Sequence, residues 1–157
     1  LRNVLAKAGT GFPTRIHPSG TYVCMEGPQF STRAESELHR SWGASLIGMT
    51  AMPEAKLARE AELCYALVAL PTDYDCWKPH PAKPDQAKLL EEILANVKAA
   101  TQNAIELIRR ATPKIVEAGD RACPCQSAPA LAIWTDKARI PPEAKERLGR
   151  LLGKYLP

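Results

Sequence analysis

Two carboxyl groups, Asp73 and Asp75, follow an apolar run of the sequence and could perform acid–base chemistry. A carboxyl group that is withdrawn from water beside a second carboxylate has a raised pKa. Such a group can hold a proton near neutral pH and give it to a leaving base. Two acids after a strand also commonly form turns, so the spacing alone leaves a structural role open.

Other residues of neighbouring loops could bind a flat heterocycle beside these acids. Phe30 offers an apolar ring face, Met49 a soft packing group, and Thr50 and Thr72 offer hydroxyl groups. A ring whose edge carries both hydrogen-bond donors and a protonatable nitrogen would suit this combination. Phe30 and Met49 are also ordinary core residue types, so core packing is the alternative interpretation for each of them.

The elements that must position these residues alternate between strands and helices. Runs of β-branched, aromatic and apolar residues predict strands at 21–26, 44–49 and 64–70. The last run is apolar on both faces, as in a central parallel strand. Short crossovers favour an α/β fold with a mostly parallel or mixed central sheet flanked by helices. Because the carboxyl ends of such strands share one edge, we expect three loops to converge there: 26–31, 49–50 and 72–77.

Helix signals accompany these strands. Thr32 followed by Glu35 predicts a capping box for a helix that ends near Trp42. Other helices are predicted within 1–19, from Pro53, from Asp85 to near Arg110, and over 142–156. The long helix carries an apolar stripe at helical spacing, formed by Leu89, Leu90, Ile93, Leu94, Val97, Ala100, Ala104, Leu107 and Ile108. The final helix is expected to bury Leu148, Leu151, Leu152 and Tyr155.

The composition excludes several functional classes. A length of 157 residues with 45% hydrophobic and 24% charged residues is typical of one globular domain and excludes a disordered chain. No apolar run approaches the roughly 18 residues that cross a bilayer, and no secretion signal is present, so we expect a cytoplasmic protein without membrane contact. The net charge of +4 comes from interleaved acids and bases. Nucleic-acid binding is not expected, because it favours a basic stripe with neighbouring aromatics.

The five cysteines include one close pair, Cys123 and Cys125, on either side of Pro124. Three interpretations are open: inert loop thiols, a strained disulfide, or two ligands of a metal ion. A metal site needs further ligands at suitable spacing. None stands nearby in the sequence, so no metal site is expected.

Several short motifs occur in a fixed order along the chain: Gly20-Thr21, Glu26-Gly-Pro-Gln-Phe-Ser-Thr-Arg-Ala-Glu-Ser36, Trp42-Gly-Ala, Gly48-Met-Thr50, Met52-Pro-Glu54 and Thr72-Asp-Tyr-Asp-Cys-Trp77. In this order they resemble the C-terminal half of S-methyl-5′-thioadenosine phosphorylases, members of the trimeric purine nucleoside phosphorylase superfamily. The resemblance is strong over 17–110 and looser elsewhere. It implies that residues 1–157 form the C-terminal part of a single phosphorylase domain, without the N-terminal phosphate-binding half.

The resemblance implies a pentosyltransferase that cleaves S-methyl-5′-thioadenosine with phosphate, giving adenine and 5-methylthioribose 1-phosphate. Asp73 would protonate N7 of the base as the catalytic acid, Asp75 would hold the exocyclic amine, and Thr50 would touch phosphate. Phe30 would stack on the purine, and Met49 would pack on the ribose. The implied substrate-binding set is Phe30, Ile47, Met49, Thr72, Asp73, Asp75 and Leu89. Relatives that prefer 6-oxopurines carry Asn in place of the first acid, because an ionised carboxylate repels an oxo group.

The same resemblance implies the partners of the chain and leaves alternatives open. It implies no cofactor, phosphate as co-substrate, a homotrimer, and activity only after completion by the N-terminal half. A purine nucleoside or methylthioinosine phosphorylase with another base choice is one alternative, because Gly48 stands where some methylthioadenosine enzymes have Asn. A non-catalytic, purine-binding half of a split enzyme is the other. The Cys123-Pro-Cys125 stretch also resembles a cysteine pair of some thermophilic members.

Overall fold

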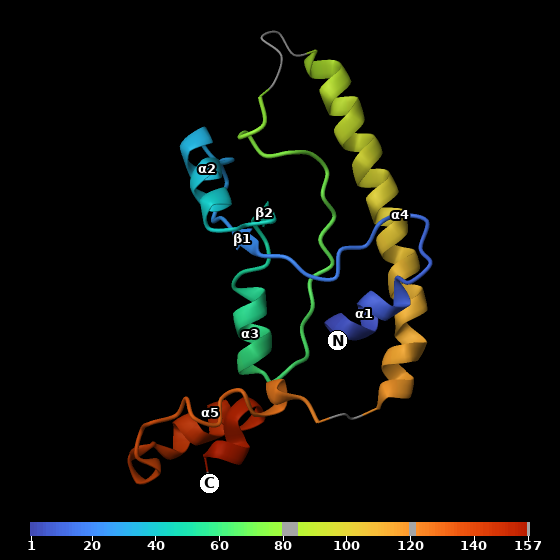
Figure 1. Ribbon diagram of the computed structural model, residues 1–157. Coiled ribbons are helices and arrows are strands. Elements are labelled where there is room, and N and C mark those ends of the chain that lie inside the picture. Colours follow the sequence, from blue (N-terminus) through green and yellow to red (C-terminus); the bar gives the residue numbers. More distant parts are fainter. Residues whose placement is uncertain (80–84, 120–121, 157) are drawn as a thin grey trace. The chain divides into compact units, whose positions relative to one another are not determined.

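The computed structural model describes residues 1–79, 85–119 and 122–156 (Figure 1). Contacts between its segments divide the chain into two compact units. The first unit is Leu1–Ala51 with Leu67–Gly119, and the second is Met52–Ala66 with the described part of Asp120–Pro157. Two of the loops predicted to form the site fall in the first unit: loop 26–31, which carries Phe30, and loop 72–77, which carries Asp73 and Asp75 and is called the acid loop below.

A small parallel sheet forms the centre of the predicted ligand edge. Strand β1 (Tyr22–Cys24) pairs with β2 (Leu46–Gly48) in parallel, with Val23 opposite Ile47. Helix α2 (Arg33–Ser41) connects the two strands. The strand–helix–strand order predicted for this part of the chain is therefore confirmed.

Helix α2 begins and ends where the local sequence predicts. The Thr32 hydroxyl accepts a hydrogen bond from the Glu35 N–H at 3.3 Å, and the Glu35 carboxylate accepts one from the Thr32 N–H at 2.7 Å. These reciprocal bonds satisfy two N–H groups that the helix itself cannot. At the other end Gly43 has a φ of +79°, a left-handed conformation in which glycine meets no Cβ penalty.

The third predicted strand, 64–70, is absent: within the described residues this segment belongs to no sheet. Its apolar composition was the reason for the prediction. A strand also requires a neighbour with free backbone N–H and C=O groups, and the described residues place none alongside it. The prediction was therefore wrong for this chain, and the described sheet has two strands.

Helix α4 (Gln86–Ala118) begins as expected but ends later than expected. The Asp85 carboxylate accepts hydrogen bonds from the N–H groups of Ala87 and Lys88 at 3.1 and 3.2 Å, which caps the helix. The helix continues past Arg110, through Pro113, to Ala118. Helix α1 (Arg2–Ala8) packs against α4 (Figure 1), and Ala111 is buried in this contact region, which stabilises the extra turns.

The core of the first unit is small and covers only part of the predicted stripe. Its buried residues are Ala8, Leu107 and Ala111, with half-buried Leu5, Phe12, Ile16 and Val68 packed around them. The rest of the stripe on α4 includes exposed members, namely Leu90, Leu94, Val97 and Ile108. The helical spacing was predicted correctly, but the described residues do not cover the whole apolar face.

The second unit contains α3 (Glu54–Glu60), α5 (Pro142–Leu152) and three short 3₁₀ helices, η1 (Pro124–Ser127), η2 (Lys137–Arg139) and η3 (Gly153–Tyr155). Leu148, Leu152 and Tyr155 are half-buried as expected of the inner face of α5 and η3, whereas Leu151 is 48% exposed. Burial of Leu151 was therefore a wrong prediction, and Leu156 is the buried leucine of this segment.

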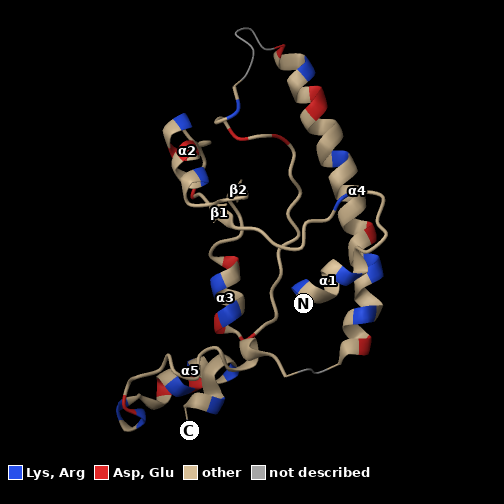
Figure 2. Cartoon of the chain, in the orientation of Figure 1, with Lys and Arg blue, Asp and Glu red and all other residues tan. Residues whose placement is uncertain are grey.

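Acidic and basic side chains are interspersed along α3, α4 and α5 (Figure 2). Among the described residues, no helix combines the length and the apolar character that a bilayer crossing requires.

Candidate active site

The parallel register brings the loops after β1 and β2 to the same edge. Cys24 lies opposite Gly48, and the N–H of Met25 donates a hydrogen bond to the Gly48 carbonyl oxygen at 2.9 Å. A Cβ on Gly27 would lie 3.0 Å from the Met49 sulfur, and Gly27 has a φ of +71°. The Met49 side chain therefore packs on a glycine that no other residue replaces without strain.

The acid loop lies against the loop that carries Phe30. The Cys76 thiol donates a hydrogen bond to the Ser31 carbonyl oxygen at 3.2 Å. The Arg40 guanidinium of α2 stacks over the ring of Trp77, 3.8 Å from its centroid. These contacts fix the C-terminal end of the Asp73–Trp77 loop to the β1–α2 region. Together with the packing of Met49 on Gly27, they bring together the three loops predicted to converge.

Each acid of the pair has one hydrogen bond that orients it. The Thr72 hydroxyl donates to Asp73 Oδ1 at 2.5 Å, and the N–H of Cys76 donates to Asp75 Oδ1 at 2.8 Å. Asp75 is half-buried, whereas Asp73 is exposed. The sequence predicted that protein groups would withdraw the catalytic acid from water. The described residues leave Asp73 exposed, so this withdrawal from water is not observed in them.

The proposed ring platform and the phosphate contact are both open to solvent. Phe30 is 85% exposed, which excludes core packing in this structure. Thr50 is exposed directly after β2, and Met49 is half-buried. Ile47 is half-buried in the middle of β2, opposite Val23.

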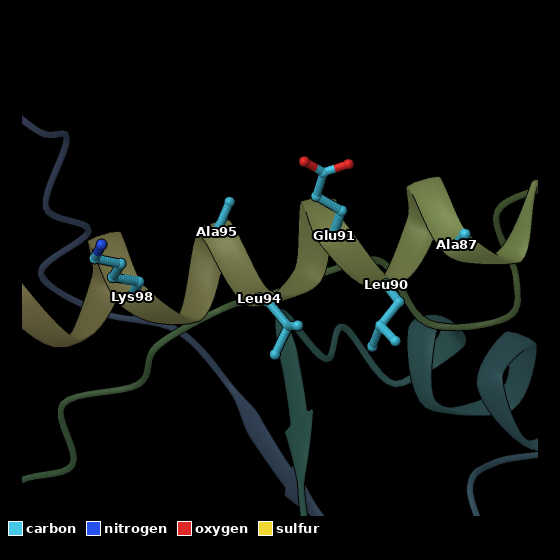
Figure 3. A pocket seen from close by; sticks show the side chains of 6 residues that line it. All are labelled: Ala87, Leu90, Glu91, Leu94, Ala95 and Lys98. Atoms are coloured by element: carbon cyan, nitrogen blue, oxygen red, sulfur yellow. The ribbon is translucent and has the colours of Figure 1, made fainter.

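An apolar hollow lies on the first turns of α4. Its volume is about 470 Å³, and it is lined by Ala87, Leu90, Glu91, Leu94, Ala95 and Lys98 (Figure 3). Figure 3 shows Leu90 and Leu94 projecting on the same side of the helix. Leu89, which the sequence analysis placed in the substrate-binding set, is half-buried and does not line this hollow.

The residue type at position 48 follows from its neighbour on β1. A Cβ on Gly48 would overlap the hydroxyl group of Tyr22. A longer side chain at position 48 therefore cannot be accommodated while Tyr22 keeps this position. The Tyr22 side chain takes the space that a longer residue 48 would fill.

A second group of reactive side chains lies in the other unit. The Cys64 sulfur lies 3.6 Å from that of Cys123 and 3.1 Å from that of Cys125, and the Cys125 thiol donates to Cys123 at 2.7 Å. All five cysteines are free thiols in the structure. The hydrogen bond from Cys125 lowers the pKa of Cys123, and the same bond raises the pKa of Cys125 to about 12. Sequence reasoning found no third sulfur because Cys64 is distant in the chain, and no spacing pattern could have revealed it.

Known phosphorylases resemble this chain over most of its length. Residues 1–113 match the family model described as the phosphorylase superfamily. The S-methyl-5′-thioadenosine phosphorylase of Geobacter sulfurreducens is 54% identical over 141 residues, which cover 90% of this chain and 47% of that protein. The enzyme of the same name from Koribacter versatilis is 50% identical over 152 residues, covering 97% of this chain and 47% of that protein. The chain thus spans about half the length of the curated relatives that it matches.

Solved structures show the same relationship. A methylthioadenosine phosphorylase from an Antarctic soil metagenomic library superposes with a TM-score of 0.81 and 39% identity, over 96% of this chain and 52% of that one. A methylthioadenosine phosphorylase from Schistosoma mansoni in complex with adenine superposes with a TM-score of 0.63 and 31% identity, over 83% of this chain and 49% of that one. The small parallel sheet and its helices are therefore part of a nucleoside phosphorylase-like fold.

Proposed function

The chain belongs to the phosphorylase superfamily, and on this premise we propose that it supplies the base- and sugar-binding part of an S-methyl-5′-thioadenosine phosphorylase. The observation that carries the proposal is the Cys76–Ser31 hydrogen bond, which places the acid loop against the loop of Phe30. The ring of Phe30 and the carboxyl groups of Asp73 and Asp75 are therefore grouped at one edge of the sheet. Relatives with 50–54% identity named for this activity support the choice of substrate.

The proposed reaction is phosphorolysis. A phosphate oxygen bonds to C1′ of the sugar while the bond from C1′ to N9 of adenine breaks, which yields adenine and 5-methylthioribose 1-phosphate. Positive charge develops on the sugar and negative charge on the leaving base, so a proton at N7 lowers the barrier. Asp73 would supply this proton, with its carboxyl group oriented by the hydrogen bond from the Thr72 hydroxyl.

The remaining residues would orient the base and the sugar. The ring of Phe30 would stack on the purine, and Asp75, fixed by the N–H of Cys76, would accept a hydrogen bond from the exocyclic amine. Met49 and Ile47 would provide an apolar wall below the sugar at the end of β2. Leu89 would approach the methylthio group, with Leu90 and Leu94 of the hollow continuing the apolar surface.

Binding of phosphate requires more hydrogen-bond donors or cations than the one contact proposed in this chain. Thr50 offers one hydroxyl group, and a doubly charged anion needs several donors or cations to offset its desolvation. We propose that the remaining contacts come from the half of the enzyme that the relatives carry in addition to the matched part. Phosphate is a co-substrate in this proposal and no cofactor is needed. A homotrimer in the cytoplasm is the accompanying proposal for assembly and location.

A hybrid enzyme tests the proposal. We would join the N-terminal half of the Geobacter sulfurreducens relative to this chain and measure phosphate-dependent release of adenine from S-methyl-5′-thioadenosine. We expect turnover by the hybrid, and a loss of about 10²-fold or more in Asp73→Asn, the range for removal of a general acid. Asp136→Asn is the matched control, because the Asp136 carboxylate only caps η2 in the other unit.

Two results would contradict the proposal. Adenine release by the 157-residue chain alone, at the rate of the hybrid, would show that phosphate binds wholly within these residues. Equal losses in Asp73→Asn on 6-amino and 6-oxo substrates would reject Asp73 as the residue that selects the base, since an amide can donate to an oxo group.

A second candidate differs in the sugar substituent. Gly48 with the Tyr22 hydroxyl beside it, in place of Asn, favours a purine nucleoside phosphorylase that accepts other groups at the 5′ position. Comparison of kcat/KM for methylthioadenosine, adenosine, inosine and methylthioinosine separates these specificities. A hybrid that binds adenine without turning over any of them would indicate a non-catalytic, purine-binding half.

A further inference from the structure

Three thiols of the second unit form a compact cluster that the proposed reaction does not use. The sulfur atoms of Cys64, Cys123 and Cys125 all lie within 4.8 Å of one another. Cys64 is exposed, while Cys123 and Cys125 are half-buried. The cluster therefore has two sheltered sulfurs and one on the side open to solvent.

The local sequence holds Cys123 and Cys125 in place. Pro124 is the first residue of η1, where its fixed φ favours the helical start. The N–H of Cys123 donates to the Gln126 side-chain oxygen at 3.3 Å, and the Cys123 sulfur receives the N–H of Gln126 in return. This reciprocal cap directs both sulfurs of the Cys-Pro-Cys turn toward Cys64.

A lysine joins the two segments that carry the cysteines. The Lys154 ammonium forms an ion pair with the Glu62 carboxylate and donates to the Gln126 carbonyl oxygen at 2.6 Å. The Tyr155 hydroxyl donates to the same carboxylate of Glu62. Glu62 stands two residues before Cys64, and Gln126 directly follows Cys125. These polar contacts therefore hold the three sulfurs close together without a disulfide bond between them.

The donor set suits one class of ligand. Thiolates are soft donors that select Zn²⁺ and Cu⁺ over hard cations. Around Zn²⁺, with bonds of about 2.3 Å, tetrahedral sulfurs stand roughly 3.8 Å apart. The observed separations of 2.7, 3.1 and 3.6 Å need only a small outward rotation of the side chains to reach this spacing.

We propose that Cys64, Cys123 and Cys125 form a three-thiolate site for a soft d¹⁰ cation, Zn²⁺ or Cu⁺. Each thiol loses its proton to water as its sulfur binds the ion. With Zn²⁺, water completes the fourth position on the side of the exposed Cys64, whereas Cu⁺ is satisfied by three sulfurs. The ion would cross-link the segment after α3 to the segment that opens η1, independently of the proposed phosphorylase activity.

Metal titration of the reduced, metal-free chain tests the site. Zn²⁺ and Cu⁺ would be added in separate experiments against a chromogenic chelator, and bound metal would be counted by mass spectrometry. We expect one ion per chain and a loss of affinity of at least about 100-fold in Cys64→Ser, Cys123→Ser and Cys125→Ser, since even outer-shell changes cost 10–100-fold. Cys24→Ser in β1 is the matched control and should bind like the unaltered chain. The titration, Zn²⁺ or Cu⁺, that gives the lower dissociation constant identifies the preferred ion.

A measurement on the unaltered chain guards against variants that fail to fold. Bound metal should protect Cys64, Cys123 and Cys125 from alkylation, and leave Cys24 and Cys76 as reactive as before, as mapped by peptide mass spectrometry. Equal alkylation of all five with and without metal would overturn the proposal. So would a disulfide among the three cysteines in chain purified without reductant, if the reduced chain then takes up no ion.

Discussion

The side-chain amide of Asn96, on α4, donates a hydrogen bond to the carbonyl oxygen of Thr72 at 2.7 Å. Thr72 in turn donates its hydroxyl hydrogen to the Asp73 carboxylate. Helix α4 therefore positions the acid loop through a two-step chain of hydrogen bonds, although Asn96 would not touch the substrate.

Asn96→Ala should lower kcat/KM of the hybrid enzyme by about 3- to 10-fold, the scale of one hydrogen bond. We expect the change mainly in KM, because a displaced loop weakens binding of the base while the acid remains present. Asn103→Ala, on the same helix, is the matched control. A fall in kcat with KM unchanged would contradict a positioning role.

Phe30→Ala should weaken substrate binding by about 1–3 kcal/mol, the scale of base–aromatic stacking. Because Phe30 is 85% exposed, the free energy of unfolding should stay unchanged. Trp134→Ala removes another exposed aromatic side chain, in the other unit, and should leave KM as it is. Substrate titration by calorimetry and urea unfolding measure the two quantities. Destabilisation without a change in affinity would instead assign Phe30 a packing role.

Gly48→Ala should destabilise the chain by about 1–3 kcal/mol, because the new Cβ overlaps the Tyr22 hydroxyl and overpacking carries a cost of this size. Tyr22→Phe removes that oxygen, so the double variant should lose less stability than the sum of the single variants. Gly149→Ala is the control: nothing lies near its Cβ within α5, and alanine there should stabilise the helix. Additive urea-unfolding free energies would show that Tyr22 and Gly48 do not compete for space.

Glu35 should make stability depend on pH in the acidic range. The Thr32 N–H and then the Thr32 hydroxyl donate to its carboxylate and lower the pKa of Glu35 in the folded chain. Its contribution is therefore complete above the unfolded pKa of about 4.3 and is lost as the pH falls through the lower folded value. Glu35→Gln should be less stable than the unaltered chain at neutral pH and equally stable at strongly acidic pH. A difference in urea-unfolding free energy that persists unchanged at strongly acidic pH would contradict this dependence.

Local features could be predicted from the sequence, whereas features that need distant partners could not. The capping box of Thr32 and Glu35 lies within one helical turn, and the structure confirms it. The strand at 64–70 depended on a neighbouring strand, which no local pattern reports. Similarly, the stripe on α4 identifies its apolar face, but periodicity does not reveal which part of that face is covered.

The candidate site shows the same division. Phe30 could be placed because it follows β1, and the loops after parallel strands share an edge. Asp73 and Asp75 were named for their residue types and motif, although the strand expected before them does not form in the described residues. The exposure of Asp73 could not be predicted, because burial depends on what lies above the loop rather than on the loop itself. Cys64 could not be assigned to the thiol cluster, because it is distant in the sequence from Cys123 and Cys125 and meets them only in the folded second unit.

The small core of α1 and α4 has a consequence for the dynamics of the long helix. Buried contacts are concentrated near Leu107 and Ala111, whereas Leu90 and Leu94 lie in the open hollow of the first turns. Local opening requires less free energy where fewer apolar contacts must be broken. Amide hydrogens of one continuous helix should therefore exchange with deuterium at graded rates, fast around Leu90 and slow around Leu107. The boundary between the fast and slow rates marks the point along α4 at which its contact with α1 begins to stabilise the helix against local opening.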